Sequence, residues 1–524
     1  MTAREGSLAS IRRVDWRFLL PRSAFETVAL VGEPDGAVQA GLEQVAVRVI
    51  GRPADGWSSD DPAPGLVVTI GASRSALREA LGLVPPGAWI YAGAGPRGAP
   101  GRAPLREVAA ALRAAGFGEI RRSWHWPSEP AALEIVSLDD PRAVRLTLGR
   151  RRSGPAARMK ATLAAIAFRL HLLERIVPGW SVVGRRPAAD GAGSVGAVVD
   201  PVLASALDGG DPGAGSGVVL LTPRFLASRH VIGLVVGPAG DGLTAVVKLP
   251  RFPDDDGGVR REAEALLRAA ELGVSGVPEV RAFRGAPDPV LVESPLDGVV
   301  IAGRELRART VGALGEVEAW TRGLAGGPGR REVPLRILWA PAVERVASGL
   351  EPATSMSVAV GGLAERTATI LGGLEHATVP TVLEHGDLAP PNLLRLRDGR
   401  LGVVDWEVAD LEGLPLGDLL FFAAFVAGEP AADGASSAPT ILTPAVRAVV
   451  ERQAAYLGID TSLIPALRLV MWTRWADRQL ARFVDLAIPL EDRLPVRYLR
   501  SWTAAVADME ARGRAATMRR PIDP

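Results

Sequence analysis

The chain has 524 residues, no cysteine, and 60 Lys or Arg residues against 59 Asp or Glu residues, a formal net charge of +1. Disulfide bonds and Cys-based zinc sites are excluded, and the balanced charge does not favour nucleic acid as a partner. The longest apolar run, residues 419–428, is about half of the roughly 20 residues that a membrane span needs, and the N-terminus has no apolar signal segment. We therefore expect a cytoplasmic protein with no nucleic-acid and no membrane partner, in which residues 419–428 form a buried helix.

In the N-terminal part, short apolar runs alternate with helical patterns. This alternation is typical of an α/β domain with a parallel sheet. The predicted strands are 27–32, 45–50, 66–71, 88–93, 119–127 and 180–187, and the predicted helices are 75–84 and 105–117.

A stretch rich in glycine, alanine and aspartate follows, residues 188–216. Its composition predicts a flexible linker between two domains, 1–187 and 217–524, with one short helix at about 199–207.

After the linker, strands come first and helices later. We predict strands at 217–223, 230–238, 243–250, 278–285 and 289–295, and a helix at 259–273. From about residue 304 the pattern is mainly helical, except for two apolar runs in 392–406 that flank an Asp-Gly turn and predict a hairpin.

The stretch HGDLAPPNLL, residues 385–394, contains Asn392, the one asparagine of the chain. The predicted hairpin would fold Asp405 back beside Asp387 and Asn392. Two carboxylates and one amide oxygen suit Mg²⁺, which shares its coordination shell with waters and substrate phosphates. Asp387 would then be available to accept a proton from a hydroxyl.

Lys248 ends an apolar strand, and Glu262 lies fourteen residues later in an amphipathic helix. Of the 60 basic residues only Lys160 and Lys248 are lysine. A strand lysine held by a helix glutamate is the way kinases bind the α- and β-phosphates of ATP. Glu264 is the alternative partner, and the RRE match favours Glu262.

The stretches AVVKLP, RREAEALL, VLVESPLDG, HGDLAPPN and VVDWE together resemble the aminoglycoside phosphotransferase and choline kinase-like family. The resemblance implies an α+β protein-kinase-like fold with two lobes, about 217–298 and 299–524. It implies ATP and Mg²⁺ as cofactors, with GTP as an alternative to ATP.

The roles that the resemblance implies follow residue by residue. Asp387 would deprotonate the acceptor, Asn392 and Asp405 would hold Mg²⁺, and His385 would support the loop. The nucleotide would be bound by Lys248, Glu262, Val292, Glu293 and Ser294.

The sequence departs from protein kinases at two places. No G-x-G-x-x-G covers the phosphates; the equivalent turn would be 222–230. Ala389 stands where protein kinases carry a lysine, which favours a small-molecule acceptor: an amino sugar, another sugar, an amino alcohol or a natural product.

Asp418 is interpreted as a structural carboxylate near the catalytic loop. An inactive pseudokinase that only binds remains the alternative.

Residues 20–187 resemble a degenerate class I methyltransferase, a Rossmann-like fold, through the segment LREVAAALRAAGFGEIRRSWHWP. The first strand leads into VGEPDGA without G-x-G, and the second ends without an acidic residue for ribose hydroxyls. We therefore do not expect S-adenosylmethionine as a cofactor, and a protein partner would dock on this domain. A bifunctional methyltransferase-kinase is the alternative.

Overall fold

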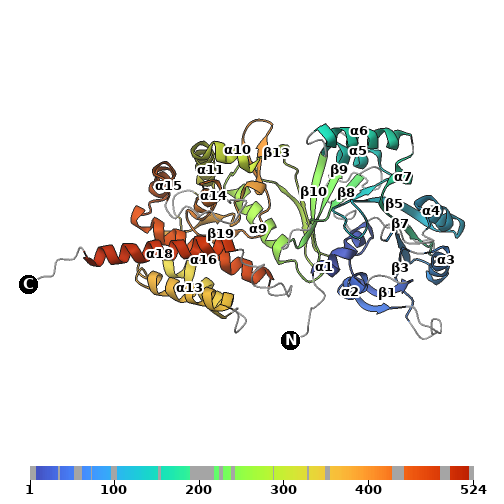
Figure 1. Ribbon diagram of the computed structural model, residues 1–524, viewed down its shortest axis with the longest axis horizontal. Coiled ribbons are helices and arrows are strands. Elements are labelled where there is room, and N and C mark those ends of the chain that lie inside the picture. The colour runs from blue at the N-terminus through green and yellow to red at the C-terminus, as the bar shows by residue number, and fades with distance from the viewer. Residues whose placement is uncertain are drawn as a thin grey trace, which may run out of the picture. The chain divides into compact units, whose positions relative to one another are not determined.

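The computed structural model describes residues 8–32, 36–51, 62–71, 73–95, 103–150, 155–170, 172–188, 217–223, 228–237, 242–286, 288–326, 330–348, 355–427, 442–483 and 496–518. The chain divides into two compact units (Figure 1). Unit 1 is Met1–Arg260 with Val280–Pro295, and unit 2 is Arg261–Glu279 with Leu296–Pro524.

Unit 1 is built on one sheet of twelve strands in the order β11-β12-β10-β9-β8-β6-β5-β7-β4-β3-β1-β2. The strands are β1 (Phe25–Val31), β2 (Ala46–Ile50), β3 (Leu66–Ile70), β4 (Trp89–Gly93), β5 (Gly118–Trp126), β6 (Glu134–Ser137), β7 (Gly179–Arg185), β8 (Gly217–Leu221), β9 (His230–Val236), β10 (Leu243–Pro250), β11 (Val280–Arg284) and β12 (Val290–Glu293). Every strand predicted in 20–295 lies on one of these, and β6 is additional.

The sheet combines parallel and antiparallel pairing. Strands β2, β1, β3 and β4 are parallel neighbours, as predicted. The expectation of parallel pairing was wrong for β7, which runs antiparallel to both β4 and β5. The physical reason is the path of the chain, which returns through the helices between β6 and β7 to the carboxyl edge of β5 and then runs back.

One pair of strands, β6 and β8, makes the sheet continuous. Ile135 lies opposite Leu220 and Val136 opposite Val219 in antiparallel register. Backbone hydrogen bonds thus join the strands before residue 188 to those after residue 217. Residues 189–216, most of the predicted linker with its short helix, lie outside the described residues. The predicted boundaries 1–187, 188–216 and 217–524 stay a prediction, because a compact unit and a functional domain need not coincide.

Helices cover the sheet of unit 1. They are α1 (Leu8–Ile11), the 3-10 helix η1 (Arg12–Leu19), α2 (Gly36–Leu42), α3 (Arg74–Leu83), α4 (Leu105–Ala114), α5 (Pro141–Arg150), α6 (Pro155–Arg169) and α7 (Leu173–Ile176), and α9 (Gly257–Glu271) passes from unit 1 into unit 2. Buried Val67, Ile90 and Val182 of the sheet pack with Leu112 and Val144 of α4 and α5. The predicted helices 75–84 and 105–117 are thereby confirmed as α3 and α4.

A buried cluster of charges joins η1 to the end of β10. Arg17 and Arg251 have no exposed surface. Arg251 donates to both carboxylate oxygens of Asp15, at 3.0 and 3.1 Å, and to Ser228 Oγ at 2.8 Å. Arg17 donates to Ser23 O at 3.0 Å and also to Arg251 O. Burial lowers the pKa of Arg17 to about 10, while Asp15 opposes the decrease.

Unit 2 is mainly helical, as predicted. Its helices are α10 (Gly303–Ala308), α11 (Thr310–Leu324), α12 (Leu335–Ser348), α13 (Ser355–Gly372), η3 (Pro390–Asn392), α14 (Gly417–Ala427), α15 (Pro444–Leu457), η4 (Thr461–Leu463), α16 (Ile464–Phe483) and α18 (Val496–Met518). The α12, α13, α16 and α18 helices pack on one another. Within this bundle, Trp502 donates its buried indole N–H to Thr367 Oγ1 at 3.1 Å.

Short strands of unit 2 form three small sheets. They are β13 (Gly298–Val300), β14 (Glu332–Pro334), β15 (Thr378–Pro380), β16 (Val382–Glu384), β17 (Leu393–Leu396), β18 (Leu401–Val403) and β19 (Asp410–Gly413). The hairpin predicted at 392–406 is confirmed as β17–β18, with Leu393 opposite Val403 and Gly399 at φ +83° in the turn. A positive φ is the conformation that favours glycine at such a turn.

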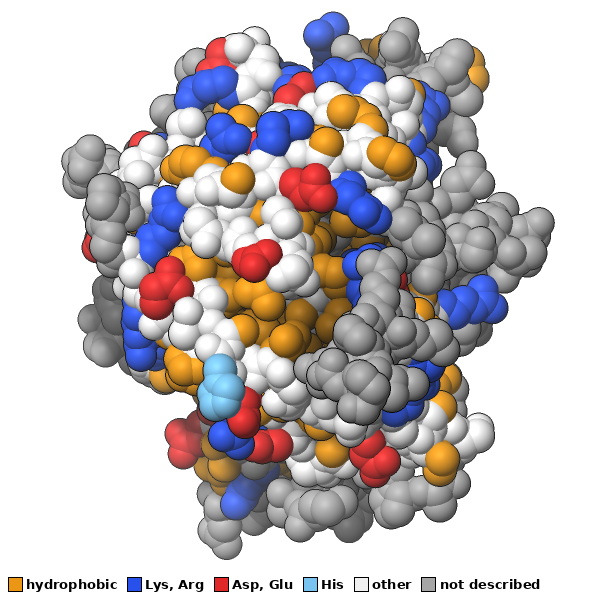
Figure 2. Space-filling view, turned by 90° about the vertical axis from the view of Figure 1, so that its left-hand side faces the viewer, with side chains coloured by type: hydrophobic (Ala, Val, Ile, Leu, Met, Phe, Trp, Pro, Cys, Tyr) orange, Lys and Arg blue, Asp and Glu red, His pale blue; other side chains and the backbone are white. Residues whose placement is uncertain are grey.

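The buried helix predicted at 419–428 is confirmed for 419–427 as part of α14, in which Leu419 and Phe422 are almost completely covered, and residue 428 lies outside the described residues. None of the helices in the described part of the chain is long and apolar enough to cross a membrane. Figure 2 shows one face of the molecule, where positive and negative side chains are interspersed around a hollow lined by hydrophobic side chains.

Candidate active site

The loop between β16 and η3 carries His385, Gly386 and Asp387, and its backbone is held by one carboxylate. Asp418, in the first turn of α14, accepts the N–H of His385 and the N–H of Gly386, both at 2.8 Å. Gly386 has a φ of +80°, and a Cβ there would lie 2.7 Å from Val408 O. These two hydrogen bonds agree with the interpretation of Asp418 as a structural carboxylate beside this loop.

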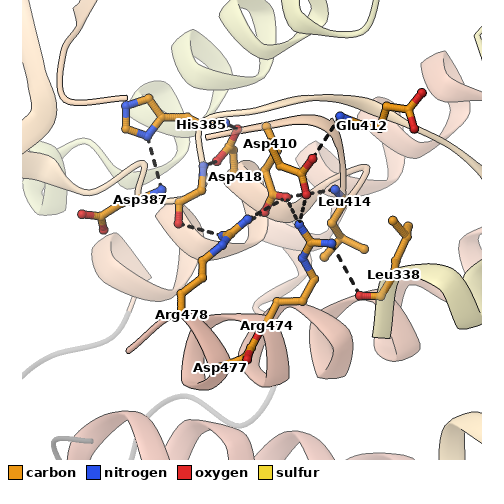
Figure 3. Close-up of polar contacts among 12 residues, drawn as sticks. Leu338, His385, Asp387, Asp410, Glu412, Leu414, Asp418, Arg474, Asp477 and Arg478 are labelled. Carbon is orange, nitrogen blue, oxygen red and sulfur yellow. Dashed lines mark hydrogen bonds and ion pairs between the residues drawn. The ribbon is translucent and has the colours of Figure 1, made fainter. Parts of the chain in front are cut away.

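Two arginines of α16, Arg474 and Arg478 (Figure 3), neutralise the buried Glu384, which directly precedes this loop. Arg474 lies 2.8 Å and Arg478 3.0 Å from Glu384 Oε2. Arg474 also pairs with Asp410 at 2.7 Å, and Arg478 donates to Gly386 O at 3.0 Å. The loop backbone is thus tied to α16 as well as to α14.

The two buried carboxylates beside the loop respond to their surroundings in opposite ways. Burial would raise the pKa of Glu384, but Arg474 and Arg478 outweigh it and lower that pKa to about 2. Burial raises the pKa of Asp418 to about 7, and the charge of Glu384 adds to the increase, whereas the two N–H donors from the loop oppose it. The paired arginines therefore keep Glu384 ionised over the whole physiological pH range.

We expect unfolding of unit 2 by acid to depend on Glu384. Its pKa falls on folding from the ordinary 4.5 to about 2, so it contributes stability above pH 4.5 that is lost as the pH falls toward 2. Asp418 acts in the opposite direction, because its pKa is raised to about 7 and the folded state takes up its proton as the pH falls from 7 to the ordinary 3.8, so the loss due to Glu384 appears below about pH 3.8. Urea unfolding at a series of pH values should show this loss in the wild type and a flatter profile in Glu384→Gln.

The matched control for this measurement is Glu365→Gln, at an exposed position of α13. Its acid profile should follow the wild type. If the free energy of unfolding of Glu384→Gln falls at acid pH as steeply as that of the wild type, the ion pairs of Glu384 do not control acid unfolding.

His385 connects the loop to the end of the β17–β18 hairpin. The N–H of Asp387 donates to His385 Nδ1 at 3.3 Å, and His385 Nε2 lies 3.1 Å from Val404 O. A neutral imidazole with its proton on Nε2 satisfies both contacts. The ring also meets Trp406 edge-on, with centroids 4.8 Å apart. This geometry fits a supporting role for His385.

Asp387, Asn392 and Asp405 are gathered at the same end of the hairpin. Asn392 donates its Nδ2 to Asp387 O at 2.9 Å and lies 3.4 Å from Asp387 Oδ2. Val404 N donates to Asn392 O at 3.1 Å, which places the following residue, Asp405, beside Asn392. Asp405 has a φ of +72°, a conformation in which aspartate is tolerated better than bulkier residues. In Figure 3 the carboxylate of Asp387 points away from the arginines of α16.

Glu262 lies in the part of α9 that belongs to unit 2, and it is completely buried, whereas Glu264 is exposed. Glu262 Oε1 accepts the N–H of Trp406 at 2.8 Å. Its neighbour Arg261 donates to Glu407 O at 3.0 Å. Two consecutive residues of α9 thus fix the segment that directly follows Asp405, and the burial favours Glu262 over Glu264.

The predicted nucleotide residues of unit 1 lie on two neighbouring strands. Lys248 of β10 lies opposite Leu291 of β12, and Val247 lies opposite Val292. Lys248 Nζ is 4.0 Å from Glu293 Oε1, and both side chains are buried. Ser294 follows directly after β12. Lys248 and Glu262 belong to different units, and the pairing predicted between them stays a prediction.

Sequence reasoning missed the charges that hold the loop: Glu384, Arg474 and Arg478. Glu384 directly precedes the HGD motif, which was the available signal. The arginines lie 90 and 94 positions away along the chain, in an arginine-rich helix whose pattern predicts no particular partner. Among the described residues, no three Asp, Glu, His or Cys side chains form a metal-binding group; the predicted magnesium set uses the Asn392 amide in place of a third such group.

Comparison with known proteins agrees with the motifs. Residues 234–434 match the model of the phosphotransferase enzyme family, which confirms the resemblance for that part of the chain. No curated protein matches the chain in sequence.

Several solved structures are similar to part of this chain. A choline/ethanolamine kinase family protein from Mesorhizobium loti is 17% identical over 54% of this chain and 90% of its own, with a TM-score of 0.36. An ethanolamine kinase from Plasmodium vivax is 12% identical over 56% and 83%, with a TM-score of 0.39. A choline kinase from Streptococcus pneumoniae is 12% identical over 55% and 93%, with a TM-score of 0.39.

Proposed function

We propose that this chain, whose residues 234–434 match the model of the phosphotransferase enzyme family, transfers the γ-phosphoryl group of ATP to a hydroxyl of a small molecule. The proposal includes a two-lobed protein-kinase-like arrangement of residues 217–524. Its support within each unit is the set of antiparallel strands β8 to β12 in unit 1 and the largely helical unit 2.

The observation that carries the proposal is the grouping of Asp387, Asn392 and Asp405 at one end of the hairpin. Because Asn392 donates its Nδ2 to Asp387 O, its amide oxygen is directed elsewhere. Two carboxylates with one neutral oxygen fit Mg²⁺, a hard cation that prefers oxygen ligands. Asn392 and Asp405 would hold the ion, which when bound would neutralise charge on the phosphates.

The reaction asks little covalent chemistry of the protein. Asp387 accepts the proton of the acceptor hydroxyl while that oxygen forms its bond to the γ-phosphorus; the bond to the bridging oxygen breaks, and ADP leaves. Lys248 contacts the α- and β-phosphates, and Glu262 is the carboxylate proposed to fix it; the buried Glu293 carboxylate lies 4.0 Å from Lys248 Nζ. The backbone of Val292, Glu293 and Ser294 binds the base, and ATP and GTP are both compatible with backbone contacts.

The acceptor is proposed only as a class: an amino sugar, another sugar, an amino alcohol or a natural product with a free hydroxyl. Ala389 lies two residues after Asp387, where protein kinases carry a lysine. It is buried and has no charge that could contact a peptide substrate. Such a loop is suited to a small acceptor that brings its own polar groups.

We expect calorimetric titration of ATP into the full chain to show binding that depends on Mg²⁺. Asn392→Ala should weaken this binding by about tenfold, because it removes one ligand of the ion. Lys248→Ala should weaken ATP binding with or without the metal, and Lys160→Ala, which replaces the other lysine of the chain, should leave it unchanged. If the folded wild type binds no ATP, the proposal is wrong and the chain is a pseudokinase.

For the N-terminal part we propose a methyltransferase-like fold that serves as a scaffold. Its support is the strand order β2-β1-β3-β4-β7-β5 of an open α/β sheet. The topological switch point lies between β1 and β3, because the chain adds β2 on one side of β1 and adds β3 and β4 on the other side. Ligands of such sheets bind at the carboxyl ends of the strands. There, Gly95 packs so closely that a Cβ would lie 2.8 Å from Gly71 Cα. The same calorimetry with S-adenosylmethionine should show no heat of binding.

A further inference from the structure

Helix α6 of unit 1 is apolar on two opposite faces. On its inner face, Ala161, Ala164, Ala165 and Phe168 pack against the core of the unit, beside α5 (Figure 1). On its outer face Met159 is exposed by 61%, Leu163 by 59% and Ile166 by 48%, and Leu170, the residue directly after the helix, is exposed by 61%. The outward side of a surface helix normally carries polar side chains, so a second apolar face opposite the core is unusual.

The four exposed side chains form one line along α6. Their spacing of four, three and four residues places them on the same side of the helix, since 3.6 residues make one turn. Single exposed hydrophobic residues are ordinary on protein surfaces, but a continuous row marks a surface that something covers. Leu172, two residues after Leu170, is also 39% exposed.

The charge of the same segment has one sign. Between Pro141 and Leu173 the sequence has eight Lys or Arg residues and no Asp or Glu, in a chain whose total charge is +1. Among the described side chains of this segment, Arg145, Arg150 and Arg169 are exposed. An apolar row within a purely basic segment is typical of a helix that lies on an anionic surface.

We propose that α6 is a peripheral attachment site for an anionic lipid surface. In this mode of binding the row from Met159 to Leu170 enters the boundary of the acyl chains, and the exposed arginines of the same segment contact the phosphate groups of the lipids. No membrane span is needed for this mode of binding, so the absence of a long apolar run does not oppose it. Pairing of α6 with a second copy is disfavoured, because it would bring two segments of the same positive charge together.

The test is co-sedimentation of the full chain with vesicles of phosphatidylglycerol and phosphatidylcholine in equal parts, compared with vesicles of phosphatidylcholine alone. We expect binding to the mixed vesicles only, weaker when salt is raised from about 0.1 M to about 0.5 M. The double variant Leu163→Gln with Ile166→Gln, which adds no charge, should reduce binding by roughly tenfold or more.

The matched control is Val47→Gln, which changes an 87% exposed valine of β2 in the same unit, and it should bind as the wild type does. An unchanged unfolding midpoint will show that the double variant is folded. Equal binding to both kinds of vesicle, or full binding by the double variant, would overturn the proposal. If the wild type is a dimer and the double variant is a monomer, the row is a contact between two copies of the chain. If the wild type binds a nucleic-acid duplex and no vesicles, the row belongs to a nucleic-acid site.

Discussion

Replacing Asp387 with asparagine is expected to lower the rate of phosphoryl transfer by about 10²–10⁴-fold while ATP binding persists. The substitution keeps the size of the side chain and removes the group that accepts the proton of the acceptor hydroxyl. The proposed metal ligands, Asn392 and Asp405, are unchanged. The measurement is ADP release, with an acceptor found by screening or with water as the acceptor.

The loop should largely keep its shape in this variant, because its main anchors are contacts to backbone groups, and the asparagine amide oxygen can still accept from Asn392 Nδ2. Asp418 holds the backbone of His385 and Gly386, and Arg478 donates to Gly386 O. The Asn392 amide donates to the backbone oxygen of Asp387 at 2.9 Å. A large loss of turnover in Asp387→Asn would therefore report chemistry and not the collapse of the loop.

Asp398→Asn provides the matched control, since Asp398 is an exposed carboxylate in the turn of the same hairpin. This variant should turn over as the wild type does. Comparable turnover in Asp387→Asn and the wild type, with ATP still bound, would remove Asp387 from the role of general base and direct attention to another carboxylate.

The candidate site was predictable where its geometry is local. Asp387 and Asn392 lie five residues apart, and the Asp-Gly turn at 398–399 brings Asp405 back beside them. The turn residues specify the hairpin, and the hairpin specifies the grouping. The charged support was not predictable, because Glu384 meets Arg474 and Arg478 across 90 or more residues. Only packing of α16 against the loop selects these arginines from the 58 in the sequence.

The sequence pattern also did not predict that strands on both sides of the linker form one continuous sheet in unit 1. The strand that joins the two parts, β6, has four residues and ends before an Asp-Asp-Pro sequence that reads as a turn. Its hydrogen bonds run to β8, a strand that lies beyond the linker in sequence. Composition predicts a separation at residues 188–216, whereas backbone pairing on either side of that stretch joins one sheet. A linker that is predicted from composition is compatible with pairing between the strands that flank it.

Removing the charge of Asp15 is expected to destabilise unit 1 by about 3–5 kcal/mol. In Asp15→Asn, the fully buried guanidinium of Arg251 loses the carboxylate to which it donates at 3.0 and 3.1 Å. The guanidinium of Arg17, 4.0 Å from the same carboxylate, loses its ion pair as well. Two buried positive charges then remain close together, which costs far more than a missing surface ion pair. The measurement is denaturant unfolding followed by tryptophan fluorescence, since Trp16 lies between Asp15 and Arg17 in the sequence.

Two further variants separate this explanation from a general effect of substitution. Glu107→Gln breaks an exposed ion pair with Arg74 in the same unit and should leave stability unchanged, because exposed pairs contribute little. The double variant Asp15→Leu with Arg251→Met removes both charges and should recover part of the loss. If the double variant is less stable than Asp15→Asn, the cluster acts through its hydrogen-bond geometry and not through its charge. Arg251 directly follows β10, which carries Lys248. Recovery of stability in the double variant together with weaker ATP binding would show that this cluster also positions β10 for the proposed contact of Lys248 with ATP.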